Sequence, residues 1–193
     1  MLKQQLGNIF FFILMSAPLL AGANELFPQI DEKMRDNLRQ SVTGPYGFED
    51  HIEAKVWLAD MSARLRRTLP NEQYRMDLLK KIHAEATRAG LRPELVLAVI
   101  QVESNFDQFA ISVAGARGLM QVMPFWIKEI GHPGDNLFKT EVNLRYGTTI
   151  LKYYLDMENG DLWRALARYN GSLGQTKYPR RVISTLRTRW FEH

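Results

Sequence analysis

Apolar residues recur along most of this chain every three or four positions, the spacing that places side chains on one face of an α-helix. The alternation typical of half-buried strands is almost absent. The strongest segment follows Pro93: residues 95–100 are all apolar, so we predict a helix that begins at this proline and is buried on every side. Further helices are predicted over residues 73–89, 119–130, 142–157 and 161–169, and from Pro179 onward.

Residues 24–72 carry weaker helical signals. We predict a short helix around residues 31–40 and a second helix in which Leu58, Met61 and Leu65 share one face. The chain therefore divides into an N-terminal helical segment, 24–72, and a main domain, 73–193. We expect the first segment to pack on the second as a helical cap, or to dock cell-envelope protein partners, and we expect a monomer.

The first 23 residues have the features of a secretory signal peptide. Lys3 is their only charge, residues 9–15 are an unbroken apolar run, and Ala21-Gly22-Ala23 is a small-x-small cleavage site. A retained membrane anchor is the alternative, but the apolar stretch is short and contains a proline. The chain has no cysteine, which excludes a lipid-modified N-terminus and any disulfide. The sequence thus predicts a periplasmic or secreted protein.

The formal net charge is only +4, but basic residues concentrate toward the C-terminus. After Asp161, seven arginine and lysine residues face a single acid, Glu192. Such a patch suits nucleic acid, anionic lipid or the carboxylates of cell-wall peptides, and a simple solvated helix face explains it equally well. No nucleic-acid-binding motif accompanies it, and the export signal also argues against nucleic acid as a partner.

Glu103 is the most informative single residue. It closes the apolar helix that begins at Pro93, so apolar surroundings and the negative end of the helix dipole both disfavour its ionised form. We therefore expect a raised pKa, which is what a general acid near neutral pH requires.

Three blocks of sequence, the first of which begins at this residue, resemble the family 1 lytic transglycosylases, the soluble-lytic-transglycosylase-like members of the lysozyme-like superfamily. The first is Glu103-Ser104-x-Phe106 with Ser112-x-x-Gly-Ala-x-Gly-Leu-Met-Gln121. The second is residues 143–151, preceded by Asn136-Leu137, and the third is Ala167-Arg168-Tyr169-Asn170. The blocks stand in the family's order over residues 75–189, which makes the match specific. The resemblance implies a mainly α, lysozyme-like helical catalytic domain with the N-terminal helices as an appendage.

The resemblance also implies the reaction: cleavage of the MurNAc–GlcNAc β-1,4 bond of peptidoglycan glycan strands without water, leaving 1,6-anhydro-MurNAc ends. Glu103 would protonate the glycosidic oxygen and then act as the base, while the substrate supplies the nucleophile. Tyr169 would hold the Glu103 carboxyl in orientation.

Four further residues take substrate-binding roles by their motif positions. Asn170, Ser112 and Gln121 would hydrogen-bond the sugar, and Met120 would lie beneath a sugar ring. The chain departs from the family pattern at Gln108, at Val113-Ala114 and after Asn170, which leaves groove shape and substrate preference open.

Two other readings remain at this stage. A hydrolysing muramidase on the same fold would need a second acid, and Asp107, Asp135 and Glu141 are the nearby candidates, each better explained as a loop or cap residue. A non-catalytic wall-binding or assembly protein is the other reading. No cofactor and no metal are expected, because the four histidines are isolated and cysteine is absent.

Overall fold

The structure of this 193-residue chain is a computed structural model that describes residues 32, 35–36 and 52–191. The described part is helical, and its only β pairing consists of isolated bridges between residues 111, 117 and 122. The helices are α2 (Ile52–Leu65), α3 (Glu72–Arg88), α4 (Pro93–Glu103), α5 (Phe125–Ile130), α6 (Thr140–Met157), α7 (Leu162–Tyr169), α8 (Lys177–Thr185) and the π-helix η1 (Leu186–Trp190). The predicted signal peptide, residues 1–23, lies outside the described residues, as does most of the predicted helix at 31–40. Of the helices in the described part, none is long and apolar enough to cross a bilayer.

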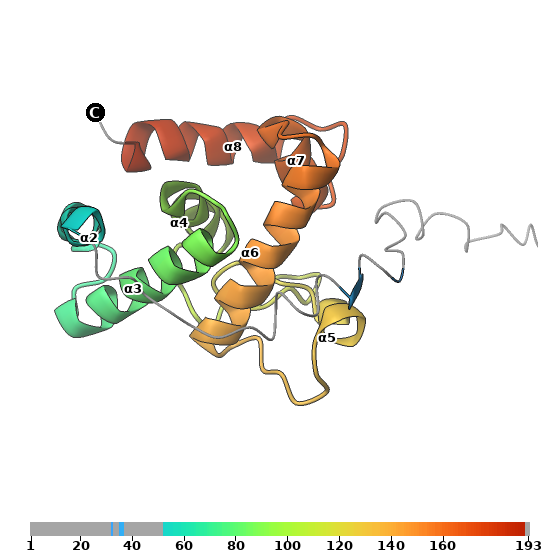
Figure 1. The fold of residues 1–193 in the computed structure, drawn as a ribbon, viewed down its shortest axis with the longest axis horizontal. Helices are drawn as coiled ribbons and strands as arrows, with labels where there is room; N and C mark the ends of the chain where they lie inside the picture. Colours follow the sequence, from blue (N-terminus) through green and yellow to red (C-terminus); the bar gives the residue numbers. More distant parts are fainter. Residues whose placement is uncertain (1–31, 33–34, 37–51, 192–193) are drawn as a thin grey trace, which may run out of the picture.

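Helix α4 lies at the centre of the molecule. Figure 1 shows it beneath α8 and beside α3, while α6 runs past α3 toward α7. Pro93 occupies its first turn, and residues 95–100 are buried, as the sequence predicted. Beyond Glu103 the backbone turns sharply, because Asn105 and Phe106 both adopt left-handed conformations, with φ of 49° and 68°.

Helix α2 contributes to the same hydrophobic core. Leu58, Met61 and Leu65, the residues predicted to share one face, are all buried. The indole of Trp57 donates a 2.7 Å hydrogen bond to the carboxylate of Glu94 in α4. The side chains of α2 therefore fill space between the later helices, while the boundary at residue 72 stays a prediction.

The segment before α5 differs from expectation. A single helix was predicted over residues 119–130, but only Phe125–Ile130 is helical. Gly118 and Gln121 have left-handed backbone conformations, with φ of 74° and 48°, and Pro124 cannot donate a backbone hydrogen bond. The amide of Asn143 in α6 instead accepts from the N–H of Met120 and donates to the carbonyls of residues 117 and 137, all at 2.8 Å.

Gly147 lies inside α6, as predicted, and another segment does approach it closely. The neighbour is a side chain rather than a backbone: a Cβ added to Gly147 would lie 2.7 Å from Cβ of Met120. The glycine therefore allows the loop that carries Met120 to pack directly on α6.

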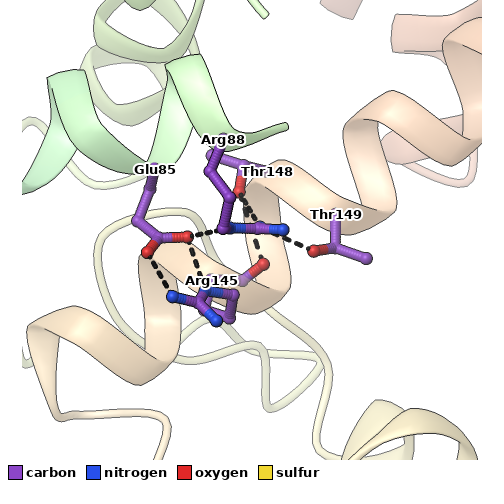
Figure 2. A network of polar contacts seen from close by, with 5 residues as sticks. All are labelled: Glu85, Arg88, Arg145, Thr148 and Thr149. Atoms are coloured by element: carbon purple, nitrogen blue, oxygen red, sulfur yellow. Dashed lines mark hydrogen bonds and ion pairs between the residues drawn. The ribbon is translucent and has the colours of Figure 1, made fainter. Parts of the chain in front are cut away.

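A buried ion pair joins α3 to α6 (Figure 2). Both carboxylate oxygens of Glu85 accept hydrogen bonds from the guanidinium of Arg145, at 2.6 and 2.7 Å, and both side chains are almost fully buried. Arg88 donates to Glu85 as well and reaches the hydroxyls of Thr148 and Thr149. The network fixes the position of α6 relative to α3.

The C-terminal turn is anchored at both sides. The indole of Trp190, which is fully buried, donates a 2.9 Å hydrogen bond to Gln101 of α4, and its ring packs edge-on against Phe106. On the other side, Arg64 of α2 donates to the backbone carbonyl of Arg189 at 2.9 Å. The η1 segment thus joins α2 to the end of α4.

Candidate active site

Glu103 lies at the C-terminal end of α4, where the chain leaves the core. The next residue, Ser104, donates a 2.8 Å hydrogen bond from its hydroxyl to the carbonyl of Leu119. This contact ties the end of the helix to the loop of residues 110–123, so the carboxyl of Glu103 faces a wall formed by that loop.

A tyrosine from a distant helix contacts this carboxyl. The hydroxyl of Tyr178, in the first turn of α8, donates a 2.6 Å hydrogen bond to Oε1 of Glu103. Tyr178 is itself buried, and burial raises its pKa well above the usual value. The phenol therefore stays protonated and acts as a donor at any physiological pH.

The environment of Glu103 matches the expected electrostatics. Burial raises the pKa of Glu103 from its usual 4.5 to about 7, while the Tyr178 hydrogen bond and the positive charge of Arg181 act in the opposite direction. Because burial outweighs these two effects, a large fraction of Glu103 is protonated at neutral pH. Such a carboxyl can donate a proton and later accept one.

The contact expected for Tyr169 needs correction. Its hydroxyl donates to the backbone carbonyl of Met120 at 2.8 Å, not to Glu103. Tyr169 still lines the same pocket, and burial, followed by the negative charge of Glu103, raises the pKa of its hydroxyl well above the usual value. Tyr178 takes the orienting contact because α8 packs directly over α4, whereas α7 ends at Tyr169 beside the loop that carries Met120.

Glu103 opens into a pocket of about 340 Å³. One side is apolar: Trp126 of α5 and Ile150 and Tyr154 of α6 form it, and each is largely buried by its neighbours. The remaining wall is the 110–123 loop together with the end of α7. An apolar floor with a few polar groups around it is the usual composition of a small-ligand site.

Two of the predicted binding residues line this pocket but also hold its wall together. The hydroxyl of Ser112 accepts a 3.0 Å hydrogen bond from the N–H of Ala116 and so closes a turn. The amide nitrogen of Gln121 donates to the carbonyls of Ala110 and Gly118, at 3.1 and 3.0 Å. The hydroxyl proton of Ser112 and the amide oxygen of Gln121 are the groups left for a ligand.

Met120 does not take the predicted place beneath a sugar. It is fully buried against Gly147, and the pocket is lined by Met123 instead. The left-handed residue Gln121 reverses the chain between these two methionines, which a sequence pattern could not reveal. Asn170, by contrast, lines the pocket as predicted and is exposed there.

The carboxylates considered as a second acid are engaged elsewhere. Asp107 accepts from the N–H of Phe109 in a turn, Asp135 accepts from the N–H of His132 and from the hydroxyl of Tyr146, and Glu141 pairs with Lys81. In the described part of the chain, Glu103 is the single carboxylate that lines the pocket.

Sequence reasoning missed Tyr178, Asn143 and Trp126. Asn143 stands in the second motif block, so its position was known but not its role as the support of the loop. Tyr178 precedes Pro179 at the start of the last helix, and an aromatic residue beside a helix start is too common a signal to indicate a catalytic contact. No group of three potential metal-ligating side chains gathers anywhere in the described ranges.

Comparison with known proteins gives consistent matches. Residues 80–186 match the family described as "Transglycosylase SLT domain". The "Transglycosylase" of Enterobacteria phage PRD1 is 33% identical over 112 residues, which are 54% of this chain and 41% of the relative. The "Membrane-bound lytic murein transglycosylase C" of Yersinia pestis (strain Pestoides F) is also 33% identical over 112 residues, or 50% of this chain and 31% of that protein.

Among solved structures, an inactive mutant of the lytic transglycosylase Slt from Pseudomonas aeruginosa is 28% identical, with a TM-score of 0.45, and the match covers 55% of this chain and 20% of that one. The matched region thus spans less than half the length of each of these relatives.

Proposed function

Because the chain belongs to the Transglycosylase SLT domain family, which its residues 80–186 match, we propose that it is a peptidoglycan lytic transglycosylase. In this proposal the protein cleaves the MurNAc–GlcNAc β-1,4 bond without water and leaves 1,6-anhydro-MurNAc ends. Its substrate is the glycan strand of the cell wall, and its location is the periplasm or the cell exterior.

The observation that carries this proposal is the isolation of Glu103. An ordinary glycosidase needs two carboxylates across the scissile bond, one as acid and one as base or nucleophile. Here one carboxyl with a pKa of about 7 faces the pocket, and the nearby carboxylates Asp107, Asp135 and Glu141 are engaged elsewhere. This arrangement favours substrate assistance over attack by an activated water.

The chemistry then divides into two proton transfers. Glu103, in its acid form, protonates the glycosidic oxygen as the bond to the muramoyl anomeric carbon breaks, and the 2-acetamido oxygen of the same sugar attacks that carbon. The resulting carboxylate removes the proton of the muramoyl 6-hydroxyl, whose oxygen attacks the anomeric carbon and expels the acetamido oxygen. Glu103 ends protonated, and the two reacting groups of the sugar gain the advantage of intramolecular attack.

Tyr178 determines which carboxyl oxygen of Glu103 transfers the proton. Its hydroxyl donates to Oε1, so the proton of the acid form resides on Oε2, the oxygen left to face the substrate. The apolar surface of Trp126 and Ile150 suits a sugar ring, while Asn170 and the free groups of Ser112 and Gln121 suit its hydroxyl and N-acetyl substituents.

Digestion of purified sacculi in ¹⁸O-labelled water tests the proposal. A transglycosylase releases muropeptides that carry no label, are lighter by one water than hydrolysis products and lack a reducing end. The Glu103→Gln variant serves as the control and should release nothing. Labelled, reducing muropeptides would identify a hydrolase instead, and binding of sacculi without any product would identify a non-catalytic wall-binding protein.

A further inference from the structure

A second cavity adjoins Glu103 on another side. It has a volume of about 520 Å³ and lies between the end of α4 and the length of α8. We call it the α4/α8 groove; it shares no lining residue with the pocket described above. It is nevertheless close to the same carboxyl, because Val102 and Asn105 flank Glu103 and the charge of Arg181 acts on it.

The α4/α8 groove is lined by hydrogen-bond donors and positive charge. Helix α8 contributes pairs of residues four positions apart, which therefore lie on one face, while α4 contributes the amide of Gln101 and the turn after α4 contributes the amide of Asn105. The polar lining residues are Arg180, Arg181, Ser184, Thr185, Gln101 and Asn105, and Val102 completes the lining. The oxygen of the Gln101 amide is occupied by the indole N–H of Trp190, so this amide offers its N–H groups to the groove.

Both arginines are exposed, and among the described residues neither forms a salt bridge, although the charge of Arg181 is felt by Glu103. Elsewhere in the fold arginines form ion pairs, such as Arg64 with Asp60 and Arg145 with Glu85. In the described part of the chain no carboxylate pairs with the guanidinium of Arg180 or Arg181, and no carboxylate lines the groove. The N–H donors of both guanidinium groups are therefore available to a ligand.

The position of the groove limits what that ligand can be. A glycan strand with its scissile oxygen at Glu103 extends beyond this residue in both directions, and the apolar pocket accounts for one part of it. The α4/α8 groove has no aromatic surface on which a sugar could stack. Its guanidinium groups instead suit carboxylates, with which arginine forms bidentate hydrogen bonds.

We propose that the α4/α8 groove binds the carboxylates of the peptide stem attached to muramic acid, and that Arg180 and Arg181 thereby make the protein prefer peptide-bearing strands over bare glycan. This inference rests on the proposed function, because it takes peptidoglycan as the substrate. Two arginines of the basic C-terminal patch would then select peptide-bearing strands, instead of merely attracting any negative charge.

Binding measurements in the Glu103→Gln background test the proposal without turnover, and they remove any effect of Arg181 on the acid. Three ligands are compared by calorimetry: a GlcNAc–MurNAc tetrasaccharide with its peptides, the same sugar after amidase treatment, and chitotetraose. The second ligand keeps the lactoyl carboxylate of muramic acid, and the third has no charge. The double variant R180Q/R181Q should weaken binding of the first ligand about tenfold and leave the other two unchanged.

A matched control removes the same charge from the same helical run. Lys177 and Arg187 are exposed and lie outside the groove, so K177Q/R187Q should bind all three ligands as the parent does. Equal weakening by this control, or no weakening by R180Q/R181Q, would overturn the proposal. If R180Q/R181Q also binds the amidase-treated sugar more weakly, the arginines contact the lactoyl carboxylate instead of the peptide. If it binds chitotetraose more weakly, the substitutions have damaged the sugar pocket. Either outcome also overturns the proposal.

Two precautions keep the result clear. Thermal unfolding of the variants checks that α8 is intact, and if R181Q disturbs it, the single exposed substitution Arg180→Glu provides the same comparison. The proposed function fails separately, when the unmutated protein releases no anhydro product from sacculi. The proposed role of the α4/α8 groove is rejected when the peptide-bearing sugar binds R180Q/R181Q as well as it binds the parent. It is also rejected when one of the contrary outcomes of the preceding paragraph occurs.

Discussion

The hydroxyl of Tyr178 donates a 2.6 Å hydrogen bond to Oε1 of Glu103, although 75 residues separate them in the sequence. The two groups come from α8 and α4, which pack against each other over the central core. Burial favours the acid form of Glu103, while this hydrogen bond and the charge of Arg181 stabilise the carboxylate form, and the pKa of about 7 is the balance of the three. A change at Tyr178 should therefore alter both the geometry and the pH response of Glu103.

The Tyr178→Phe substitution separates these effects. Loss of the hydrogen bond removes an influence that lowers the pKa of Glu103, so the pH above which kcat/KM falls should move upward from its position near pH 7. The rate below that pH should also drop by about tenfold or more, but by less than the roughly 10²–10⁴ that complete loss of general acid–base catalysis would cost. A pH–rate profile on soluble peptidoglycan measures both.

Tyr169→Phe is the matched control for that experiment. The Tyr169 hydroxyl contacts the carbonyl of Met120 rather than the carboxyl, so its loss should cost about 0.5–1.5 kcal/mol of stability without a shift in the pH profile. A shifted profile in Tyr169→Phe and an unshifted one in Tyr178→Phe would reverse the two assignments.

Glu103 should destabilise the folded protein as it ionises. Its pKa is higher in the folded state than the usual 4.5, so the folded state binds the proton more tightly and loses stability as pH rises from about 4.5 to about 7. Because one pKa unit corresponds to about 1.4 kcal/mol, Glu103→Gln should be more stable than the parent by up to about 3 kcal/mol above pH 7.

Below about pH 4.5 this difference should disappear, since the carboxyl is then protonated in both states. Urea unfolding of both proteins across this range provides the test. A gain in stability that is independent of pH would mean that shape, not charge, distinguishes the glutamine variant.

Removal of one partner of the buried pair Glu85 and Arg145 should lower the free energy of unfolding strongly, whereas replacement of both by apolar residues should lower it much less. Glu85→Ala leaves the Arg145 charge buried without its main partner, so the free energy of unfolding should fall by about 3–5 kcal/mol. The double variant E85M/R145M removes both charges and should lose much less than the two single variants together. A double-mutant cycle from urea unfolding measures the difference.

The exposed pair of Lys152 and Asp156 is the control for this measurement. Asp156→Ala should change stability by no more than about 0.5 kcal/mol, because water screens the pair. Similar losses at Asp156 and Glu85 would contradict the importance given to the network in Figure 2.

Gly147→Ala should loosen the loop that forms the pocket wall. The added methyl group would overlap Met120, so we expect a loss of about 1–3 kcal/mol in unfolding free energy, together with reduced activity. Gly134→Ala, where an added Cβ meets nothing within 4 Å, should be nearly neutral. Thermal melts and sacculus assays of both variants check this, and equal effects at the two glycines would show that packing on Met120 is unimportant.

Local pattern was sufficient for most helices. Pro93, the apolar run after it and the N-cap residue Asp161 define their helices without help from the rest of the chain, and the mainly α prediction is confirmed for the described residues. The family resemblance drawn from the motif blocks is confirmed as well. The predicted helix over residues 119–130 was wrong in its first half, because the amide of Asn143, in a different helix, determines that backbone.

For the candidate site, the sequence predicted which residues occupy motif positions but not the contacts that their side chains make. Glu103 and its raised pKa follow from an acid at the end of an apolar helix, which is local information. The contact with Tyr178 depends on how α8 crosses α4, and the burial of Met120 depends on two left-handed residues beside it. Neither is encoded in spacing along one element.

The position of Trp190 makes the carboxyl-terminal turn a structural support for the chemistry. The indole of Trp190 contacts Gln101 and Phe106, which lie on either side of Glu103 in sequence, and the same turn is held from outside by Arg64 of α2. A protein engineer who shortens the chain before Trp190, or who places a rigid fusion directly after it, would disturb the acid without touching any residue of the pocket. Affinity tags are for this reason better joined through a long flexible linker.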